Sequence, residues 1–447
     1  MTDKLNKTYK KAIEIILSIP KDTRIRVISH YDADGISAAA IICKALYHAG
    51  YDFHSTLMRN PFDKGLTRVS KEENQLIIFL DMGSGQIETI EKMNCKSIIV
   101  DHHQYLKEKP AKHVFQINAN LCGINGNYEA CGASLTYGLC KALNHDNSNL
   151  VSLAITGIMG DKQYIGGIRG YNKSIIDEAL KNNLITEKVG IKFYGESIFD
   201  ALYYSVDPYF SGVSGNKEVI NDLLDKFKIN TDTKCENLSE NQMSQLQSYL
   251  MFLLVKKGCE KNILDTIIRQ RYYSTNIYGC ELERFADLLD SCGKSGNRGL
   301  GLSSAIGDNK SFNEAVKLEK EYKQKILDEL IRLENDGFIE KKGFKYFYSI
   351  DSSLGGVIGG IATNFILDSE KPLMSIVKKD DEIHVSCRGN QQLVKQGLDL
   401  GFAMKKSSEK LGGHGGGHAI ASGATIQASK EEEFLKIVDE IIINQLK

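Results

Sequence analysis

The sequence predicts an α/β protein with a parallel sheet in its N-terminal part, a helical connector, and a smaller α/β domain at its C-terminus. Three observations support this fold class. Short apolar runs alternate with helical patterns over residues 1–165, and this alternation of strands and helices is typical of a doubly wound sheet. Leucine-rich helical stretches dominate the middle of the chain, and new apolar strand patterns begin near residue 340. We expect domains at residues 1–214, 215–339 and 340–447.

The N-terminal part contains five apolar runs that predict strands and four patterns that predict helices. The strands are expected at residues 25–29, 53–58, 75–80, 97–100 and 114–117. The helices are expected at residues 36–48, 86–93, 133–143 and 150–158. Ligands of such sheets collect beyond the carboxyl ends of the strands, so polar residues that follow these strands are candidates for a site.

The remaining chain divides into two patterns. Residues 242–256 and 318–333 predict helices, and the second carries enough Lys and Glu to be a long solvated helix. Beyond them, the sequence predicts strands at 344–350, 372–377 and 383–386, a glycine-dense segment at 412–418 and a final helix from Glu431. Aromatic residues alternate along the first of these strands; we favour core packing for them over stacking of nucleic-acid bases.

Charge and composition limit the classes of function. The net charge of the 447 residues is −1, so no global positive field attracts nucleic acid, and a polyanion must meet local clusters or bound metal. The ten cysteines form no C-x-x-C pair and predict reduced thiols. No apolar run approaches the roughly 18 residues that span a bilayer, and residues 1–20 predict a helix. We therefore expect a cytoplasmic protein without a membrane partner.

Candidate metal ligands follow the apolar runs of the N-terminal part. Asp32, Asp34, Asp81, His102 and Asp161 could supply a binuclear centre, with His30 as a possible sixth ligand. Two divalent ions about 3.5–4 Å apart need such a set, with at least one bridging carboxylate. A mixed carboxylate and imidazole shell favours manganese over calcium or zinc.

Each of these residues also has a structural explanation when it is taken alone. Asp32 or Asp34 could cap the helix that begins near residue 36, and Asp161 could cap a turn. The pair His102-His103 could be one buried and one exposed imidazole. Their joint occurrence near the ends of consecutive apolar segments favours a metal site.

Four motifs together resemble a known family. Ser29-His-Tyr-Asp-Ala-Asp-Gly35, Asp81-Met-Gly-Ser-Gly85, Asp101-His-His103 and Gly157-Ile-Met-Gly-Asp161 resemble, in order, the motifs of the DHH phosphoesterases. Gly416-Gly-His-Ala-Ile-Ala-Ser-Gly423, preceded by Val385-Ser-Cys-Arg388, is similar to the glycine-rich signature of the DHH-associated domain. The resemblance covers about residues 24–165 and 340–427, and Gly-Asp-Lys-Gln163 points to the archaeal RecJ-like branch.

The resemblance implies a role for each matched residue. One metal would take Asp32 and Asp81, and the other would take Asp34, Asp81, His102 and Asp161, with His30 as a further ligand. His103 would contact the scissile phosphate as a catalytic residue, and Asp101 would orient its neighbours. In the second domain, a set of residues would bind substrate phosphate: Arg388, Gly415, Gly416, Gly417 and His418.

The resemblance also implies an activity. The implied enzyme is a manganese- or magnesium-dependent phosphodiesterase. It would be an exonuclease that hydrolyses single-stranded DNA or RNA from an end, through a water activated by two metals. A phosphoesterase for short oligonucleotides, cyclic dinucleotides or 3′-phosphoadenosine phosphate is the first alternative. The second is a subunit of the replication machinery that binds the GINS complex, with or without nuclease activity. These readings connect the protein to DNA repair or DNA replication.

One glycine-rich stretch outside the matched motifs, residues 292–301, contains Gly-Lys-Ser. Its spacing does not match the G-x-x-x-x-G-K pattern of a nucleotide-binding loop, and no apolar strand precedes it. We expect instead a loop whose Lys294 and Arg298 face a nucleic-acid backbone.

Overall fold

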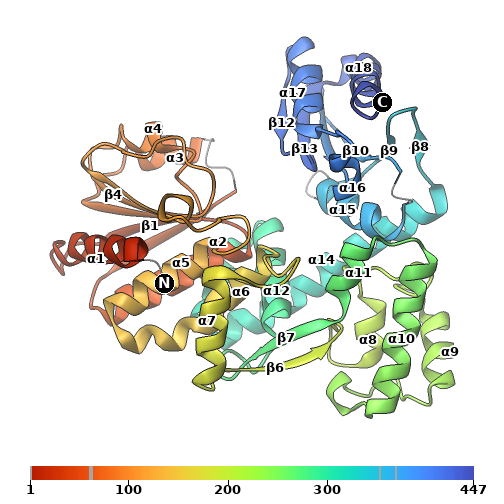
Figure 1. The fold of residues 1–447 in the computed structure, drawn as a ribbon, viewed down its shortest axis with the longest axis horizontal. Coiled ribbons are helices and arrows are strands. Elements are labelled where there is room, and N and C mark those ends of the chain that lie inside the picture. The colour runs from red at the N-terminus through yellow and green to blue at the C-terminus, as the bar shows by residue number, and fades with distance from the viewer. Residues whose placement is uncertain (1–2, 60–63, 352–353, 368–369) are drawn as a thin grey trace. The chain divides into compact units, whose positions relative to one another are not determined.

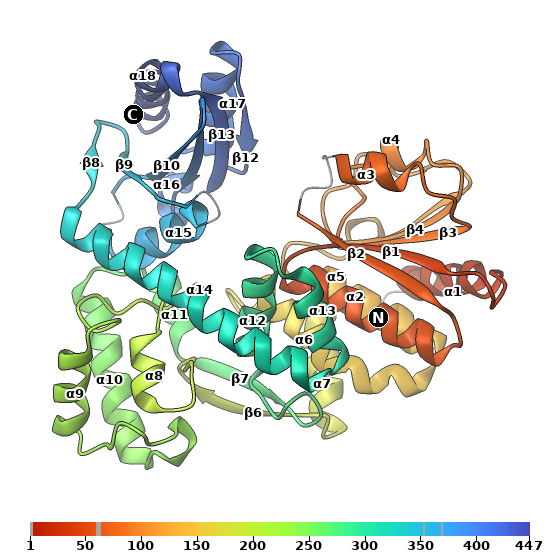
Figure 2. The same cartoon turned by 180° about the vertical axis from the view of Figure 1, so that it is seen from behind.

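A computed structural model describes residues 3–59, 64–351, 354–367 and 370–447 (Figures 1 and 2). The chain forms two compact units. The first unit contains Met1–Lys192 and Arg269–Glu319, and the second contains Phe193–Ile268 and Lys320–Lys447. Helix α14 (Asn309–Asp336) contributes residues to both. The predicted division into three domains remains a prediction.

The first unit is built on a five-stranded parallel sheet, as predicted. Its strands, in spatial order, are β2 (Phe53–Met58), β1 (Ile25–His30), β3 (Leu76–Leu80), β4 (Lys96–Asp101) and β5 (Val114–Asn118). The helices before, between and after them are α1 (Asp3–Leu17), α2 (Ala33–His48), α3 (Lys64–Val69), α4 (Ile87–Ile90), α5 (Gly132–Leu143) and α6 (Val151–Gly160), with the short 3₁₀ helices η1 (Asn120–Cys122) and η2 (His145–Leu150). The predicted α/β fold class is confirmed.

The central strands are apolar because both faces of the sheet are covered. Ile28, Phe79 and Ile99 point to one face, where they pack with residues of α3 and α4. Val27 and Ile78 point to the other face, into the larger core that α1, α2, α5 and α6 share. Figure 1 shows these two layers of helices on opposite sides of the sheet. This arrangement leaves the carboxyl ends of the strands as the edge where polar side chains gather.

The rest of the first unit contains an antiparallel pair of strands that the sequence analysis did not identify. These are β6 (Ile185–Gly190) and β7 (Arg269–Ser274), accompanied by α7 (Gly170–Lys181), α12 (Leu282–Lys294) and α13 (Arg298–Ile306). Strand β7 is polar in sequence, yet its Arg271 is 3% exposed and pairs with Glu283. Since ion pairing replaces apolar burial here, hydrophobic periodicity carries no signal for this strand.

The second unit combines helices with a mixed sheet. Its strand order is β12 (His414–Gly417), β13 (Ala421–Gln427), β11 (Glu382–Arg388), β10 (Leu373–Lys379), β9 (Lys345–Tyr348) and β8 (Ile339–Glu340), with β9 and β10 parallel. Its helices are α8 (Ile198–Tyr203), α9 (Lys217–Lys226), η3 (Cys235–Asn237), α10 (Glu240–Lys256), α11 (Lys261–Ile267), α15 (Gly355–Phe365), α16 (Gln391–Lys395), α17 (Leu400–Lys410), η4 (Ala428–Lys430) and α18 (Glu431–Gln445).

The aromatic residues near β9 pack mostly into the protein. Phe344 and Tyr346 belong to the core of the C-terminal sheet, and Phe347 is also buried. Tyr348 is 38% exposed, and its hydroxyl donates to Glu431. Core packing therefore accounts for this aromatic strand. Across the parts of the chain that the structure describes, no helix combines the length and the apolar character needed to cross a membrane.

Candidate metal centre

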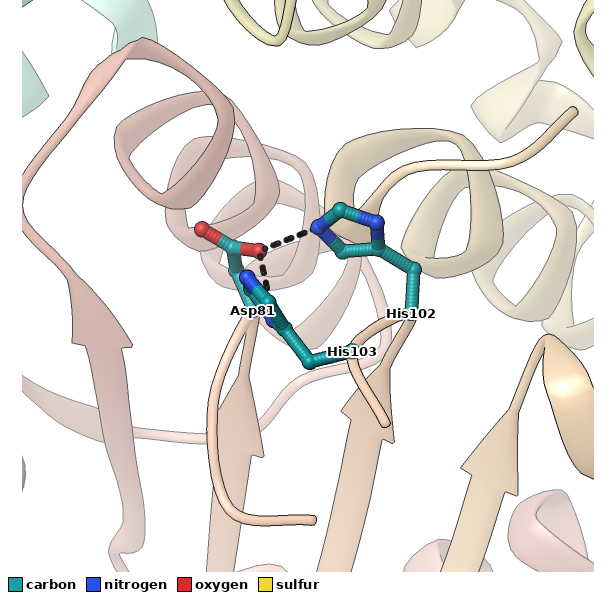
Figure 3. Close-up of side chains that lie close together, drawn as sticks. All are labelled: Asp81, His102 and His103. Atoms are coloured by element: carbon teal, nitrogen blue, oxygen red, sulfur yellow. Dashed lines mark ion pairs between the residues drawn. The ribbon is translucent and has the colours of Figure 1, made fainter. Parts of the chain in front are cut away.

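The six predicted metal ligands meet at the carboxyl edge of the parallel sheet. His30 ends β1, Asp32 caps α2, and Asp34 lies in the first turn of that helix. Asp81 follows β3, His102 and His103 follow β4, and Asp161 caps the carboxyl end of α6. Figure 3 shows Asp81 with His102 and His103 on the loops that follow neighbouring strands.

Asp81 lies between the other groups. Its Oδ1 is 3.2 Å from His102 Nε2 and 3.9 Å from His103 Nδ1, and its Oδ2 is 3.4 Å from His30 Nδ1. The side chain is 2% exposed, and its backbone has a φ of 55°, in the left-handed region that few residues other than glycine adopt. Such backbone strain persists where the surroundings impose it, which is frequent at functional sites.

Three groups of side chains have donor atoms that lie within 4.8 Å of one another. They are His30, Asp32 and Asp81; Asp81, His102 and His103; and Asp34, His102 and Asp161. Asp81 belongs to the first two groups, and His102 to the last two. The donor set contains carboxylates and imidazoles without a thiolate, which suits a divalent cation such as manganese or magnesium better than thiolate-bound zinc.

The electrostatics of the centre also suit a cation. Burial raises the pKa of Asp34, and the neighbouring carboxylates of Asp81 and Asp161 raise it further. Burial lowers the pKa of His102, but the surrounding carboxylates outweigh it and the net pKa is raised. The same balance raises the pKa of His30 to about 12. The clustered carboxylates therefore require positive charge between them, from protons on the imidazoles or from a metal ion.

Unsatisfied polar atoms mark the same place. His30 Nδ1, Asp81 Oδ1 and His102 Nε2 are buried and make no hydrogen bond of acceptable geometry. Buried polar groups nearly always have a partner, so each exception needs an explanation. All three atoms belong to the donor groups described above. The residues therefore fit a bound divalent cation.

Neighbouring groups hold the carboxylates in place. Asp34 accepts hydrogen bonds from Gly132 N (2.6 Å) and Ala133 N (2.8 Å) at the start of α5, where a helix favours negative charge. Asp101 accepts from Ser84 N at 2.9 Å and from His102 N at 2.8 Å, and its Oδ1 lies 2.8 Å from His103 Nδ1. Although burial raises the pKa of Asp101, His103 lowers it to about 2. Asp101 is therefore a carboxylate that orients the turn carrying both histidines.

Gln163 connects two of the candidate ligands, a role that the sequence analysis did not assign. Its Nε2 lies 2.9 Å from Asp161 Oδ2, 2.9 Å from Gly126 O and 3.0 Å from Ala130 O. The same Gly126 carbonyl is 2.6 Å from His102 Nδ1. Asn172 Nδ2 donates to Gln163 Oε1 at 2.6 Å. Gln163 thereby links the orientation of Asp161 to that of His102.

Helix α12 supports the turn between β1 and α2. Asp290 Oδ1 accepts from Ala33 N at 2.8 Å, and Lys294 Nζ donates to Asp290 Oδ2 at 2.7 Å. Arg298 Nη1 donates to Leu57 O at 3.2 Å. Lys294 and Arg298 therefore have partners within the protein, and their contact with a nucleic-acid backbone stays a prediction. No motif in the sequence marks Asp290, because it acts on a residue 257 positions away.

The predicted phosphate-binding residues lie together in the second unit. Arg388 pairs in register with Ala421, and His418 N donates to Ala421 O at 2.8 Å in the turn between β12 and β13. A Cβ at Gly415 would lie 2.6 Å from Met404 O of α17, so packing alone requires glycine there. Gly416 and Gly417 have φ values of 153° and 141°. The chain brings these residues to one end of the sheet, and their binding of phosphate remains a proposal.

Comparison with known proteins identifies the family. Residues 24–158 match the DHH family N-terminal domain, residues 343–444 match the DHHA1 domain, and residues 143–298 match the archaeal Cdc45 family. The uncharacterized protein MJ0831 of Methanocaldococcus jannaschii is 31% identical over 430 residues, which cover 95% of this chain and 94% of that protein. The chain belongs to the DHH phosphoesterase superfamily. The predicted family and its RecJ-like character are confirmed.

Solved structures share the fold of this DHH protein. RecJ from Thermus thermophilus, in complex with Mn²⁺, aligns with a TM-score of 0.61 at 15% identity over 99% of this chain and 55% of RecJ. The chain thus spans about half the length of that RecJ. Cdc45 from Entamoeba histolytica aligns with a TM-score of 0.68 at 11% identity over 98% of this chain and 99% of Cdc45. At these identities the likeness shows the fold alone.

Proposed function

We propose that this DHH protein is a metal-dependent phosphodiesterase that hydrolyses single-stranded DNA or RNA from an end. The observation that supports this most is the convergence of the six predicted ligands in three overlapping groups of donor atoms, two of which contain buried Asp81. A family member that had become only a binding protein would not need to keep six such groups together in one polar, strained site. Membership of the DHH superfamily and the RecJ-like fold agree with this reading.

The proposed ligands divide between two ions that share Asp81. Asp32 and His30 would join Asp81 at the first. Asp34, His102 and Asp161 would hold the second, which Asp81 would reach beside His102, whose Nε2 is 3.2 Å from Asp81 Oδ1. Divalent ions at such a centre supply a Lewis acid that polarises phosphate oxygens and makes water more acidic. Manganese suits the mixed carboxylate and imidazole donors, and magnesium is the alternative.

His103 is proposed to bind the scissile phosphate. Its side chain is 56% exposed, whereas that of His102 is 7% exposed, so His103 can reach a substrate. Burial lowers the pKa of His103, but its contact with Asp101 dominates the balance and the net pKa is raised. With Nδ1 held by Asp101, a protonated His103 presents its Nε2–H as a donor to a phosphate oxygen.

The test of the activity uses the purified full-length chain with DNA and RNA strands that carry labels at the 5′ or the 3′ end. With Mn²⁺ we expect stepwise release of mononucleotides, and none in EDTA. The position of the label that is released first gives the polarity. A series of strand lengths separates the exonuclease from a phosphoesterase for short substrates, whose activity would collapse beyond about five nucleotides. Absence of product at every metal concentration would refute the proposal.

A second candidate function is that of a replication subunit that binds GINS. The match of residues 143–298 to archaeal Cdc45 and the Cdc45-like fold favour it. The two functions are compatible, because an active nuclease can also be a subunit. Co-purification with GINS subunits tests this candidate, and an Asp81→Ala variant that still binds GINS would show that assembly does not need the metal centre.

Gln163→Glu is predicted to weaken Mn²⁺ binding by about 10- to 100-fold, the usual cost of losing a group that orients metal ligands. The variant keeps the shape of the side chain but cannot donate to Asp161 or to the Gly126 carbonyl. Isothermal titration calorimetry with Mn²⁺ measures the effect. Asn147→Asp is the matched control, because Asn147 is also a fully buried amide of this unit and contacts His48 and Cys140. Equal loss in both variants would point to a general effect of a buried carboxylate.

Arg388→Ala is predicted to raise the KM for labelled strands by about 10- to 100-fold, because a charge-assisted hydrogen bond to phosphate contributes roughly 1.5–3 kcal/mol. Mn²⁺ affinity should not change, since Arg388 is not a proposed ligand. Lys379→Ala is the control: this exposed cation lies at the other end of the same strand pair. A parallel loss of Mn²⁺ binding in Arg388→Ala would contradict the proposed role.

A further inference from the structure

Exposed apolar side chains lie in the loops that follow the candidate ligands. Tyr105 and Leu106 come two and three residues after His103, Tyr128 comes two residues after Gly126, and Ile165 comes four residues after Asp161. Single exposed apolar residues are common on protein surfaces. Here, however, they gather in the segments whose backbone contacts the metal centre, and two of these segments are joined to each other.

The joined segments are residues 124–130 and 161–173. Gln163 Nε2 lies 2.9 Å from Gly126 O and 3.0 Å from Ala130 O, and Asn172 N donates to Glu129 O at 2.8 Å. A Cβ at Gly170 would lie 2.6 Å from Glu129 Cβ, so the two segments are in direct contact. The Gly126 carbonyl is 2.6 Å from Nδ1 of the candidate ligand His102. Tyr128 comes two residues after Gly126, so the Cα atoms of these two residues are at most about 7 Å apart.

Tyr128 and Arg169 face each other across these two segments. The guanidinium carbon of Arg169 is 5.3 Å from the centre of the Tyr128 ring, and Tyr128 is 47% exposed. Carbonyls of Ile165, Gly166 and Gly167 accept long hydrogen bonds of 3.1–3.4 Å from the Arg169 side chain. These bonds hold the cation beside the ring, while nearly half of the tyrosine stays open to solvent.

Basic side chains lie in the segment that carries Arg169. Residues 161–173 contain Lys162, Arg169 and Lys173. They also contain one acid, the candidate ligand Asp161, and Lys173 pairs with Asp177. Segment 124–130 contributes one acid, Glu129, whose Oε2 accepts from Asn125 N at 2.9 Å. An exposed aromatic ring beside an arginine is a combination that single-stranded nucleic acids bind, because a base stacks on the ring while the cation meets the backbone.

We infer that Tyr128 and Arg169 form a stacking surface for a base of a single-stranded substrate beside the metal centre. This inference rests on the proposed function. The part of the substrate that the surface would bind is an unpaired base together with its adjacent phosphate. Stacking is tolerant of base identity, since every base has a π face. The surface therefore selects single strands without selecting a sequence.

The test measures binding of a fluorescent single strand by anisotropy in EDTA, so no hydrolysis enters the result. Tyr128→Ala should weaken binding about 5- to 100-fold, which corresponds to the loss of one stacked base. Tyr128→Phe should bind as the wild type does. Tyr47→Ala is the control: Tyr47 is 75% exposed and lies near the carboxyl end of α2, whereas the metal ligands lie at the amino end.

A strand with abasic residues makes the test specific for stacking. The wild type should lose affinity for it, and Tyr128→Ala should bind the normal and the abasic strand equally. Unchanged binding by Tyr128→Ala, or equal binding of both strands by the wild type, would overturn the inference. Failure of the proposed hydrolysis would leave these binding results unaffected, so the two failures are distinguishable.

Discussion

Replacing Asp81 by alanine is expected to lower kcat/KM on labelled strands by at least about a thousand-fold. Asp81 is the proposed bridge, so its loss removes a ligand from both ions. Metal ions contribute several kcal/mol to transition-state stabilisation. Because each 1.4 kcal/mol changes the rate about tenfold, losing roughly 4 kcal/mol lowers kcat/KM about a thousand-fold. Kinetics with Mn²⁺ and the stoichiometry of Mn²⁺ binding by calorimetry measure the effect.

Two further variants make the Asp81 result interpretable. Asp81→Asn keeps the size of the side chain and tolerates the left-handed backbone at φ 55°, so it separates metal binding from folding. Asp52→Ala replaces an exposed acid just before β2, at the amino edge of the sheet, and should leave activity unchanged. Cleavage by Asp81→Asn at the wild-type rate would show that the centre is assigned wrongly, because a bridging carboxylate cannot be removed without disturbing both ions.

Gly132→Ala should disrupt the same centre, because it places a methyl group against the side chains of Asp81 and Asp34. A Cβ at this position would lie 2.6 Å from Asp81 Cβ and 2.9 Å from Asp34 Oδ2. Neither group can move freely, since Asp81 follows the central strand β3 and Asp34 accepts from Gly132 N. Overpacking costs about 1–3 kcal/mol of unfolding free energy, and we expect loss of Mn²⁺ affinity and of activity of at least about tenfold.

The control for this substitution is Gly299→Ala in α13. Gly299 is also a helical glycine of the first unit, but a Cβ there would meet no atom within 4 Å. Alanine at an open helical position adds about 0.5–1 kcal/mol of stability, with no change in activity. Denaturant unfolding and Mn²⁺ titration of both variants separate the two outcomes. Wild-type Mn²⁺ affinity in Gly132→Ala would contradict the close packing of α5 on the carboxylates.

The parallel sheet and the candidate ligands are largely readable from local patterns. β1, β3 and β4 are nearly continuous apolar runs because helices cover both faces of the sheet. The apolar runs in the sequence therefore predict these buried strands. Five of the six candidate ligands lie at or just after the ends of those runs, since carboxyl ends of parallel strands share one edge. Asp161 instead follows the apolar helix α6. The pattern fails at β7, where buried ion pairs such as Arg271 with Glu283 take the place of apolar residues.

What the sequence determines by itself is therefore the parallel sheet and the set of acidic and imidazole groups at its carboxyl edge. The tertiary structure decides how those groups are held. Asp34 is bound by Gly132 N, 98 residues away, and Ala33 N by Asp290, 257 residues away. Gln163 and the Gly126 carbonyl join His102 to Asp161 in the same way. Local periodicity cannot encode such contacts, because they arise only when packing brings distant segments together.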